Sequence, residues 1–321
     1  MQLKDLAKLA NVSVSTASKA LKGSKELNDA TIEHVLKVAK ECGYFVEQKN
    51  KRVNASKQNG KIIIIVPEII SVYYSTLATK LIERFKQLKI SSQVYIHDFN
   101  TKNQTDIVNE SLVTSDVIGA IILDGSVDRS KFADFPIVSR RGKVVLVDNG
   151  IVELTMLVKH LKELGHKKIY LFCENFTVSR INKFIEVMHK FGLPADDSNC
   201  FVSKNRFEKA GYDLANKLMD DKNLPTAIIC SYDEIAFGAM SAFTQRGVKI
   251  PEDLSIVGIN NVPAAEFFPI PLTTLDKKKD DYCDKMVETM RLMLKNTDYQ
   301  QEQILQDVEL VVRKSTAKAK I

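Results

Sequence analysis

The chain has 321 residues, of which 45% are hydrophobic, and its formal net charge is +6. This length exceeds what one hydrophobic core usually serves, so we expect two or three domains. The opening stretch MQLKDLAKLANVS alternates charged and apolar positions without a continuous apolar run. From it we expect no signal peptide, no membrane span and a cytoplasmic protein.

The excess positive charge lies almost entirely at the start of the chain. Residues 1–60 contain eleven Lys and Arg against six Asp and Glu, whereas the rest of the chain contains 35 bases and 34 acids. A small basic module followed by a neutral body is typical of a protein that binds a polyanion such as DNA. A solvated charged surface is the alternative for this feature taken alone.

The cysteines and histidines predict no metal site, redox centre or other cofactor. The five cysteines are scattered and lack the CxxC spacing of zinc and redox sites, so we expect reduced and mostly buried thiols. They are Cys42, Cys173, Cys200, Cys230 and Cys283. The five histidines are isolated in the sequence, and for His166 we expect a structural hydrogen bond.

Three short helices are expected in the first 44 residues. The apolar residues of the first helix recur at positions i, i+3, i+4 and i+7. Ser13 is a good N-cap for a second helix, and a third begins near Asn28 as its cap. The residues expected to face inward are Leu3, Leu6, Ala7 and Ala10, then Ala17, Ala20 and Leu21, then Ile32, Leu36 and Ala39.

Small hydroxyls and lysines face outward on the second helix. Two helices joined by a three-residue turn, with short polar side chains at the start of the second, have the form of a helix-turn-helix. Hydroxyls and amides at a helix N-terminus donate to phosphates, and the side chains that follow can reach base edges. The predicted DNA-binding residues here are Ser13, Val14, Ser15, Thr16, Ser18, Lys19, Lys22 and Asn28. A plain three-helix bundle with a polar outer face is the alternative.

The rest of the chain alternates short β-branched runs with amphipathic helical stretches. The runs are KIIIIVP (61–67), QVYIHDF (93–99), VIGAIILDG (117–125), KKIYLFC (167–173), TAIICS (226–231) and DLSIVGI (253–259). This alternation predicts an α/β protein with two doubly wound parallel sheets. Ligands of such folds bind outside the carboxyl ends of the strands, so a cleft between the two sheets is the expected site.

An enzyme is not favoured by the motifs in this chain. The residues after the first expected strand, PEIISVYYS, contain no glycine where a dinucleotide-binding turn needs several, and no P-loop is present. No group of His, Cys and Asp residues has the spacing of a metal site either. We therefore expect a binding protein.

Six stretches of the chain resemble one family of bacterial regulators. They are LKDLAKLANVSVSTASKALKG (3–23), GHKKIYLF (165–172), DEIAFGAM (233–240), KIPEDLSIVGINN (249–261), PLTTL (271–275) and LVVRKST (310–316). They occur in the order and approximate spacing of the lactose-repressor/galactose-repressor (LacI/GalR) family of transcription regulators. The resemblance covers essentially the whole chain.

The resemblance implies a domain organisation and a function. It implies a helix-turn-helix head at 1–44, a hinge at 45–60 and a two-lobed periplasmic-binding-protein-like domain at 61–321. The chain is expected to pass between the lobes near 148–149, near 275–278 and once more towards the C-terminus. The expected function is repression by a homodimer that binds a pseudo-palindromic operator and responds to a small molecule, with a sugar as first choice. Control by a protein partner, or a cleft that no longer senses a ligand, is the alternative.

Several residues match effector-site positions of that family. Tyr73 matches an aromatic that stacks on a ligand ring, Arg180 matches the arginine of the ligand site, and Asn260 stands where an aspartate is common. Asp124 is added because it lies at the carboxyl end of another expected strand. A core position for Tyr73 and a surface ion pair for Arg180 are the alternatives. Asp233 is expected to cap its helix.

The hinge differs most from the family pattern. The family hinge forms a short helix on DNA whose leucines enter the minor groove, and Val53 stands at the leucine position of this chain. We predict that Val53 is a short wedge and that Arg52 contacts phosphates, with weak DNA bending and a steep salt dependence. A plain tether is the alternative.

Overall fold

The computed structural model describes residues 3–21, 27–42, 60–113, 116–123, 137–139, 149–220, 224–295, 304 and 306–320. The chain divides into two compact units. Unit 1 comprises Met1–Val145 and Cys283–Ile304, and unit 2 comprises Leu146–Tyr282 and Leu305–Ile321. The second passage between the units therefore lies at 282–283, beyond the expected 275–278 and inside a helix.

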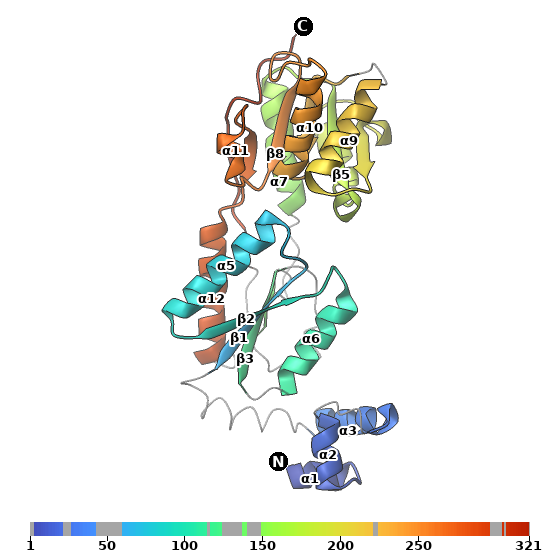
Figure 1. The fold of residues 1–321 in the computed structure, drawn as a ribbon, viewed down its shortest axis with the longest axis vertical. Helices are drawn as coiled ribbons and strands as arrows, with labels where there is room; N and C mark the ends of the chain where they lie inside the picture. Colours follow the sequence, from blue (N-terminus) through green and yellow to red (C-terminus); the bar gives the residue numbers. More distant parts are fainter. Residues whose placement is uncertain are drawn as a thin grey trace. The chain divides into compact units, whose positions relative to one another are not determined.

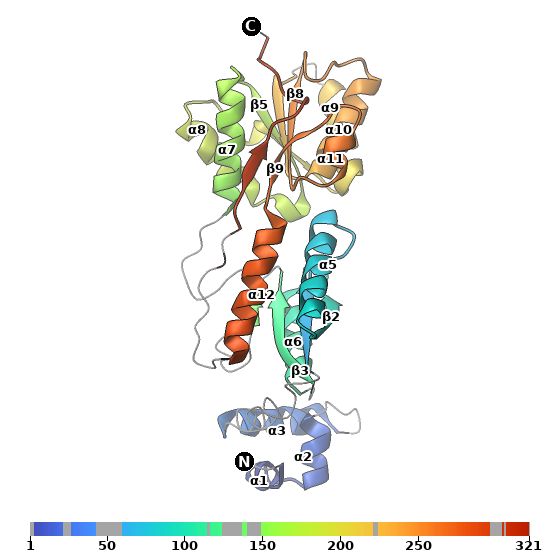
Figure 2. The same cartoon turned by 90° about the vertical axis from the view of Figure 1, so that its left-hand side faces the viewer.

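Three helices form the N-terminal part of unit 1 (Figures 1 and 2). They are α1 (Leu3–Leu9), α2 (Val14–Leu21) and α3 (Asp29–Glu41). Their shared core is rich in alanine, and short side chains at a helix contact allow a small distance between the axes. The buried residues are Leu6, Ala7, Ala10, Ala17, Ala20, Val35 and Ala39.

The expected inward position of Leu36 is wrong. The Leu36 side chain is 37% exposed, whereas Val35 is fully buried. Val35 and Ala39 are four residues apart and so lie on one face of the helix, which turns Leu36 towards its edge. Ile32 packs against the core at a partly buried position.

A four-stranded parallel sheet forms the rest of unit 1, in the order β2-β1-β3-β4. The strands are β1 (Lys61–Val66), β2 (Ser91–Ile96), β3 (Val117–Ile122) and β4 (Ile137–Ser139). The helices are α5 (Val72–Gln87), α6 (Thr101–Val113) and α12 (Lys279–Lys295). Figures 1 and 2 show α5 and α12 on one face of this sheet and α6 on the other. Arg84 of α5 binds Asp284 of α12 over 2.5 Å.

A six-stranded sheet forms unit 2, in the order β10-β9-β8-β7-β5-β6. The strands are β5 (Ile169–Glu174), β6 (Cys200–Ser203), β7 (Ala227–Cys230), β8 (Ser255–Ile259), β9 (Thr273–Asp276) and β10 (Glu309–Val311). All neighbouring strands are parallel except β10, which runs antiparallel to β9. The helices are α7 (Asn149–Glu163), α8 (Arg180–Lys190), α9 (Phe207–Asp220), α10 (Asp233–Gln245) and the short α11 (Ala264–Phe267). Two 3-10 turns occupy Asn175–Thr177 and Asp197–Asn199.

Alternate residues of the buried strands in unit 2 face two separate helix layers. Tyr170, Phe172 and Ile228 pack with the apolar faces of α9 and α10. Leu171 and Ile229 pack on the other side, with α7 and α8. Both faces of each central strand are thus covered, which explains why these strands are apolar throughout.

The predicted fold class is confirmed. Each unit has a doubly wound parallel sheet, and all six expected strands are present. Four further strands, β4, β6, β9 and β10, have three or four residues each and were not predicted. Within the described part of the chain, no helix combines the length and the apolar character needed to span a membrane.

The thiols are placed as expected. All five cysteines are free, and Cys173, Cys230 and Cys283 are buried. Burial raises the pKa of Cys173 to about 11 and that of Cys200 to about 12. Since the thiolate is the reactive form, these two side chains are inert near neutral pH.

His166 holds the C-terminal segment against unit 2. Its Nε2 lies 3.0 Å from the carbonyl oxygen of Ala317, which confirms the expected structural hydrogen bond. Burial lowers the pKa of His166 and so favours the neutral ring. Ser315 adds a second attachment, because its hydroxyl donates to the carbonyl of Ile256 over 2.6 Å.

Two glycines set the distance between α9 and α10. A Cβ atom at Gly211 would lie 1.8 Å from the carbonyl oxygen of Ile235, and one at Gly238 would lie 1.8 Å from that of Glu208. Both clashes are with the backbone of the opposite helix, which cannot move aside without separating the helices. Close approach therefore requires glycine at both positions.

Gly238→Ala is expected to lower the free energy of unfolding by about 3 kcal/mol, the upper end for overpacking of a dense core, because the clash is with backbone. Thr244→Ala, at an exposed position of the same helix, is the matched control and should change it by less than about 0.5 kcal/mol. Urea titrations followed by circular dichroism measure both values. Equal stability of the two variants would contradict the close packing of α9 on α10.

Candidate functional site

The N-terminus of α2 presents hydroxyl groups at the surface of the head. The Ser13 hydroxyl oxygen accepts a hydrogen bond from the Thr16 N–H over 3.0 Å, so Ser13 caps the helix as predicted. It also lies 2.8 Å from the Thr16 hydroxyl. Because Ala17 and Ala20 are buried in the helical core, the opposite face of α2 points outward.

The residues expected to contact DNA lie on this outer face. Ser13, Val14, Ser15 and Lys19 are exposed, and Thr16 and Ser18 are partly exposed. Val14, at 48% exposure, is an apolar side chain that the head itself does not bury. The face therefore has the hydroxyls, the cation and the apolar atoms that base and phosphate contacts require, while the contacts themselves stay predictions.

The remaining predicted DNA-binding residues are placed less fully. Asn28 caps α3 as expected, because its side-chain oxygen accepts the Thr31 N–H over 2.8 Å. Lys22, Arg52 and Val53 lie outside the described residues, and so does the hinge except for Gly60.

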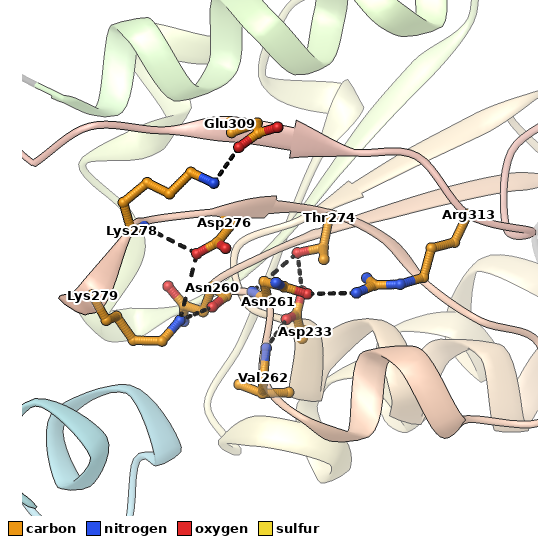
Figure 3. Close-up of polar contacts among 10 residues, drawn as sticks. All are labelled: Asp233, Asn260, Asn261, Val262, Thr274, Asp276, Lys278, Lys279, Glu309 and Arg313. Carbon is orange, nitrogen blue, oxygen red and sulfur yellow. Dashed lines mark hydrogen bonds and ion pairs between the residues drawn. The ribbon is translucent and has the colours of Figure 1, made fainter. Parts of the chain in front are cut away.

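The carboxyl ends of the strands in unit 2 form a second candidate site. We call it the carboxyl edge and define it by the residues that end or follow these strands: 174–180, 204–207, 231–233, 260–262 and 277–279. Parallel strands end on the same side of a sheet, so residues far apart in sequence come together there. Figure 3 shows the part of the carboxyl edge that follows β7, β8 and β9.

Asp233 lies at the centre of this part of the carboxyl edge. One of its carboxylate oxygens accepts the Val262 N–H over 2.8 Å, and the other accepts the Thr274 hydroxyl over 2.5 Å (Figure 3). The side chain is fully buried, and desolvation raises its pKa to about 6. The expectation that Asp233 caps its helix is wrong, because Tyr232 is the N-cap of α10. The carboxylate instead joins α10 to the turn after β8 and to β9.

Asn260 and Asn261 form the turn after β8. Both have positive φ values, 111° and 45°, in a region where asparagine is enriched. Lys279 Nζ donates to the Asn260 carbonyl over 2.5 Å, and Arg313 donates to the Asn261 side-chain oxygen over 2.8 Å (Figure 3). Two cationic side chains thus hold the turn. The predicted effector contact of the Asn260 side chain, which is 4% exposed, stays a prediction.

Arg180, the first residue of α8, lies beside a buried carboxylate. Its Nη2 is 2.8 Å from Oε2 of Glu153, and Nζ of Lys277 is 3.0 Å from Oε1 of the same group. The side chain of Glu153 is 1% exposed, that of Lys277 7% and that of Arg180 14%. Arg180 is therefore in an ion pair, but the pair is largely withdrawn from water and not on the surface.

Arg206 lies over two aromatic rings that follow the ends of β5 and β6. Its guanidinium carbon is 4.7 Å from the ring centre of Phe176 and 4.4 Å from that of Phe207. Its Nε donates over 3.1 Å to Glu174, a side chain that is 1% exposed. Phe207 has a φ of 52°, which is uncommon for a bulky residue, and such backbone strain concentrates at ligand sites.

The other two predicted effector residues are not in unit 2. Tyr73 lies in the first turn of α5 in unit 1, where its partly buried ring is 5.2 Å from that of Tyr74 in an edge-to-face arrangement. Asp124 lies outside the described residues. Among the residues that the structure does describe, no group of three or more His, Cys, Asp or Glu side chains could hold a metal ion.

Sequence reasoning missed Glu153, Lys277 and the group around Arg206. Glu153 directly precedes the amphipathic stretch LTMLVKHLKELG (154–165), and nothing in the local sequence distinguishes it from a solvated helix charge. Lys277 is one of three consecutive lysines, which read as a charge run. Lys277 and Arg206 follow the short strands β9 and β6, and because the sequence pattern did not reveal these strands, no signal placed the two residues at the carboxyl edge.

Comparison with known families and proteins identifies relatives over the whole chain. A family model described as "Bacterial regulatory proteins, lacI family" matches residues 2–46, and one described as "Periplasmic binding protein-like domain" matches residues 158–316. The HTH-type transcriptional repressor PurR of Mannheimia succiniciproducens is 30% identical over 98% of each chain. The HTH-type transcriptional regulator DegA of Bacillus subtilis is 28% identical over 98% of this chain and 97% of its own.

Solved structures share the fold. The lac repressor dimer bound to operator and the anti-inducer ONPF has a TM-score of 0.70 at 22% identity and covers 99% of each chain. The complex of the transcriptional regulator CelR with cellobiose has a TM-score of 0.65 at 18% identity, covering 98% of this chain and 99% of its own.

The raised pKa of Asp233 makes stability depend on pH. Because the folded pKa of about 6 exceeds the ordinary 3.8, the folded state holds more protons between these values and loses stability as pH rises through them. Asp233→Asn removes this titration and keeps an acceptor for the Val262 N–H. The free energy of unfolding of the variant minus that of the unmodified chain is expected to rise by about 3 kcal/mol from pH 3.8 to pH 7, as measured by urea titrations. A stability difference that is independent of pH would contradict this origin.

Proposed function

The chain belongs to the lacI family of bacterial regulatory proteins, with a DNA-binding helix-turn-helix head and a periplasmic-binding-protein-like body, and from this premise we propose its specific function. It is a cytoplasmic repressor that binds a pseudo-palindromic operator as a homodimer. A small molecule, a sugar or a sugar derivative, binds at the carboxyl edge and changes operator affinity. The protein has no catalytic role in this function.

The outer face of α2 is the observation that supports operator binding most directly. It offers hydroxyls at a capped helix N-terminus, an exposed lysine and an exposed valine on one surface. Phosphates accept hydrogen bonds from the helix N-terminus and so fix the helix in the major groove. Val14 then reaches a thymine methyl group, Ser15 a base edge, and Lys19 the acceptors of guanine.

The dimer follows from how little one helix can read. A single recognition helix contacts only a few base pairs, so two heads related by a two-fold axis are needed for useful specificity. The lac repressor, which shares the fold, is described as a dimer bound to operator. The same symmetry predicts two half-sites about one helical turn of DNA apart.

The composition of the carboxyl edge supports a polar organic ligand. It combines guanidinium groups, an asparagine amide and the rings of Phe176 and Phe207 at the strand ends where ligands of this fold class bind. Two neighbours with the same fold are described as complexes with cellobiose and with sucrose. A ligand changes operator affinity only through contacts that differ between two states of the protein.

Lys19→Ala and Ser15→Ala are expected to reduce discrimination between a selected operator and random DNA by about 1–3 kcal/mol each, the value of a good base contact. Thr16→Ala removes a phosphate contact and should weaken binding to all sequences alike. Lys37→Ala, an exposed lysine of α3, is the charge-matched control. Fluorescence-anisotropy titrations measure the affinities. Unchanged discrimination in Lys19→Ala would show that α2 is not the reading face.

Arg180→Lys is expected to weaken effector binding about tenfold or more, because it keeps the charge beside Glu153 and loses the fork that binds two oxygens. Operator affinity without effector should stay within about twofold. Arg246→Lys, in an exposed ion pair with Asp220, is the matched control. Sugars and sugar derivatives are screened by thermal shift, and hits by operator release. If no compound alters operator affinity while the operator binds tightly, control by a protein partner is favoured.

A further inference from the structure

Two cationic side chains converge on one buried carboxylate at the carboxyl edge. Arg180 comes from the start of α8 and Lys277 from the segment after β9, and each contacts a different oxygen of Glu153. The three side chains together carry two positive charges and one negative charge. Since all three are largely removed from water, an anion that joins them is attracted more strongly than at an exposed surface.

One donor of Arg180 is left over by this arrangement. Its Nη2 faces Glu153, whereas its Nη1 is buried and has no hydrogen-bond partner. A buried donor without an acceptor is costly and rare in native proteins, so its position calls for an explanation. A guanidinium group held by a carboxylate on one side offers its other nitrogen in a fixed direction, which suits an oxygen of a carboxylate or a phosphate.

The N-terminus of α8 adds to the same field. Arg180 is the first residue of this eleven-residue helix, its first turn contains no acidic residue, and the Ser179 side chain makes no capping hydrogen bond. The positive end of the helix dipole is therefore not neutralised by a side chain of the first turn. By contrast, α10, which begins at the same carboxyl edge, has Asp233 and Glu234 in its first turn.

Two other acidic groups at this edge, Glu174 and Asp233, already have partners. Glu174 holds Arg206, and the Asp233 carboxylate accepts from Thr274 and Val262. Carboxylates that would otherwise accept hydrogen bonds from the hydroxyls of a neutral sugar are thus engaged within the protein. Oε2 of Glu234, in the first turn of α10, is buried without a hydrogen-bond partner, but next to Arg180 and Lys277 the groups left to recognise a ligand are donors and positive charges.

From these observations we infer that the effector carries an anionic group, a phosphate ester or a carboxylate, which binds Arg180 Nη1 and Lys277 at the start of α8. The inference rests on the proposed function, in which the carboxyl edge of unit 2 holds a small molecule. In this arrangement Glu153 is a positioning residue, because it orients both cations without touching the ligand. The effector class is accordingly a sugar phosphate or a sugar acid.

Inorganic phosphate is the first probe, tested on the full chain by thermal shift at constant ionic strength. A ligand that binds the folded state alone raises the unfolding temperature, by an amount that grows with the logarithm of the ligand concentration divided by Kd. Lys277→Gln should raise the apparent Kd for phosphate about tenfold, the loss expected for one charge-assisted hydrogen bond, and it leaves Arg180 beside Glu153. Lys278→Gln is the matched control, because Lys278 pairs with the exposed Glu309 (Figure 3). Both variants lose one positive charge in unit 2, so any phosphate that binds to the basic head contributes equally to the two measurements. Equal phosphate affinity of the two variants overturns the inference.

A panel of related sugars is the second test, read by calorimetry and by operator release. It pairs glucose with glucose 6-phosphate and with gluconate, which separates phosphate from carboxylate recognition. Tighter binding of either anion than of glucose, weakened in Lys277→Gln and kept in Lys278→Gln, supports the inference. If neutral sugars bind as tightly and release the operator, the proposed function stands and the anionic effector is overturned. If phosphate binds at Lys277 but no compound releases the operator, the anion site stands and control by a sugar fails.

Discussion

The buried carboxylate of Asp233 is the contact on which the carboxyl edge of unit 2 depends. It accepts from Val262 in the turn after β8 and from Thr274 in β9, and it lies in the first turn of α10. Three segments that are separate in sequence are therefore fixed by one side chain. The neighbouring strand β8 needs a glycine at position 258, since a Cβ there would lie 2.2 Å from the Asp233 carboxylate. Removing this group would leave buried donors without an acceptor, so the geometry of the edge and the stability of the fold are coupled.

Buried acids at the carboxyl edge serve to orient cations. Glu153 faces Arg180 and Lys277, and Glu174 faces Arg206. Such buried pairs add little net stability compared with apolar packing, because desolvation offsets much of the attraction. What they do provide is direction: a guanidinium group held on one side presents its remaining donors at a defined position. This explains why a sheet with an otherwise apolar interior places its charges at the strand ends.

The head positions its polar side chains through local interactions within short helices. Its core consists largely of alanines, so three short helices pack closely without long side chains, and the polar residues of α2 remain at the surface. The hydroxyl of Ser13 caps α2 and the residue stays exposed, so one residue both begins the helix and belongs to the surface that we propose faces DNA. In the head, residues that are close in sequence form both the helix cap and the proposed DNA-binding surface. The carboxyl edge, by contrast, is assembled from residues that are far apart in sequence.

The sequence alone determined the features that depend on near neighbours. The caps Ser13 and Asn28, the alanine core of the head, the six main strands and the family followed from spacing, propensity and motif, because these signals act over a few residues. Periodicity was less exact on α3: it predicted a buried Leu36, whereas the neighbouring Val35 is buried and Leu36 is exposed. Only the tertiary structure placed Lys277 and Arg180 on Glu153, since three segments far apart in sequence meet there. Whether a lysine is solvated or joins a buried carboxylate depends on which strands end beside each other, and that is decided by the packing of the sheet.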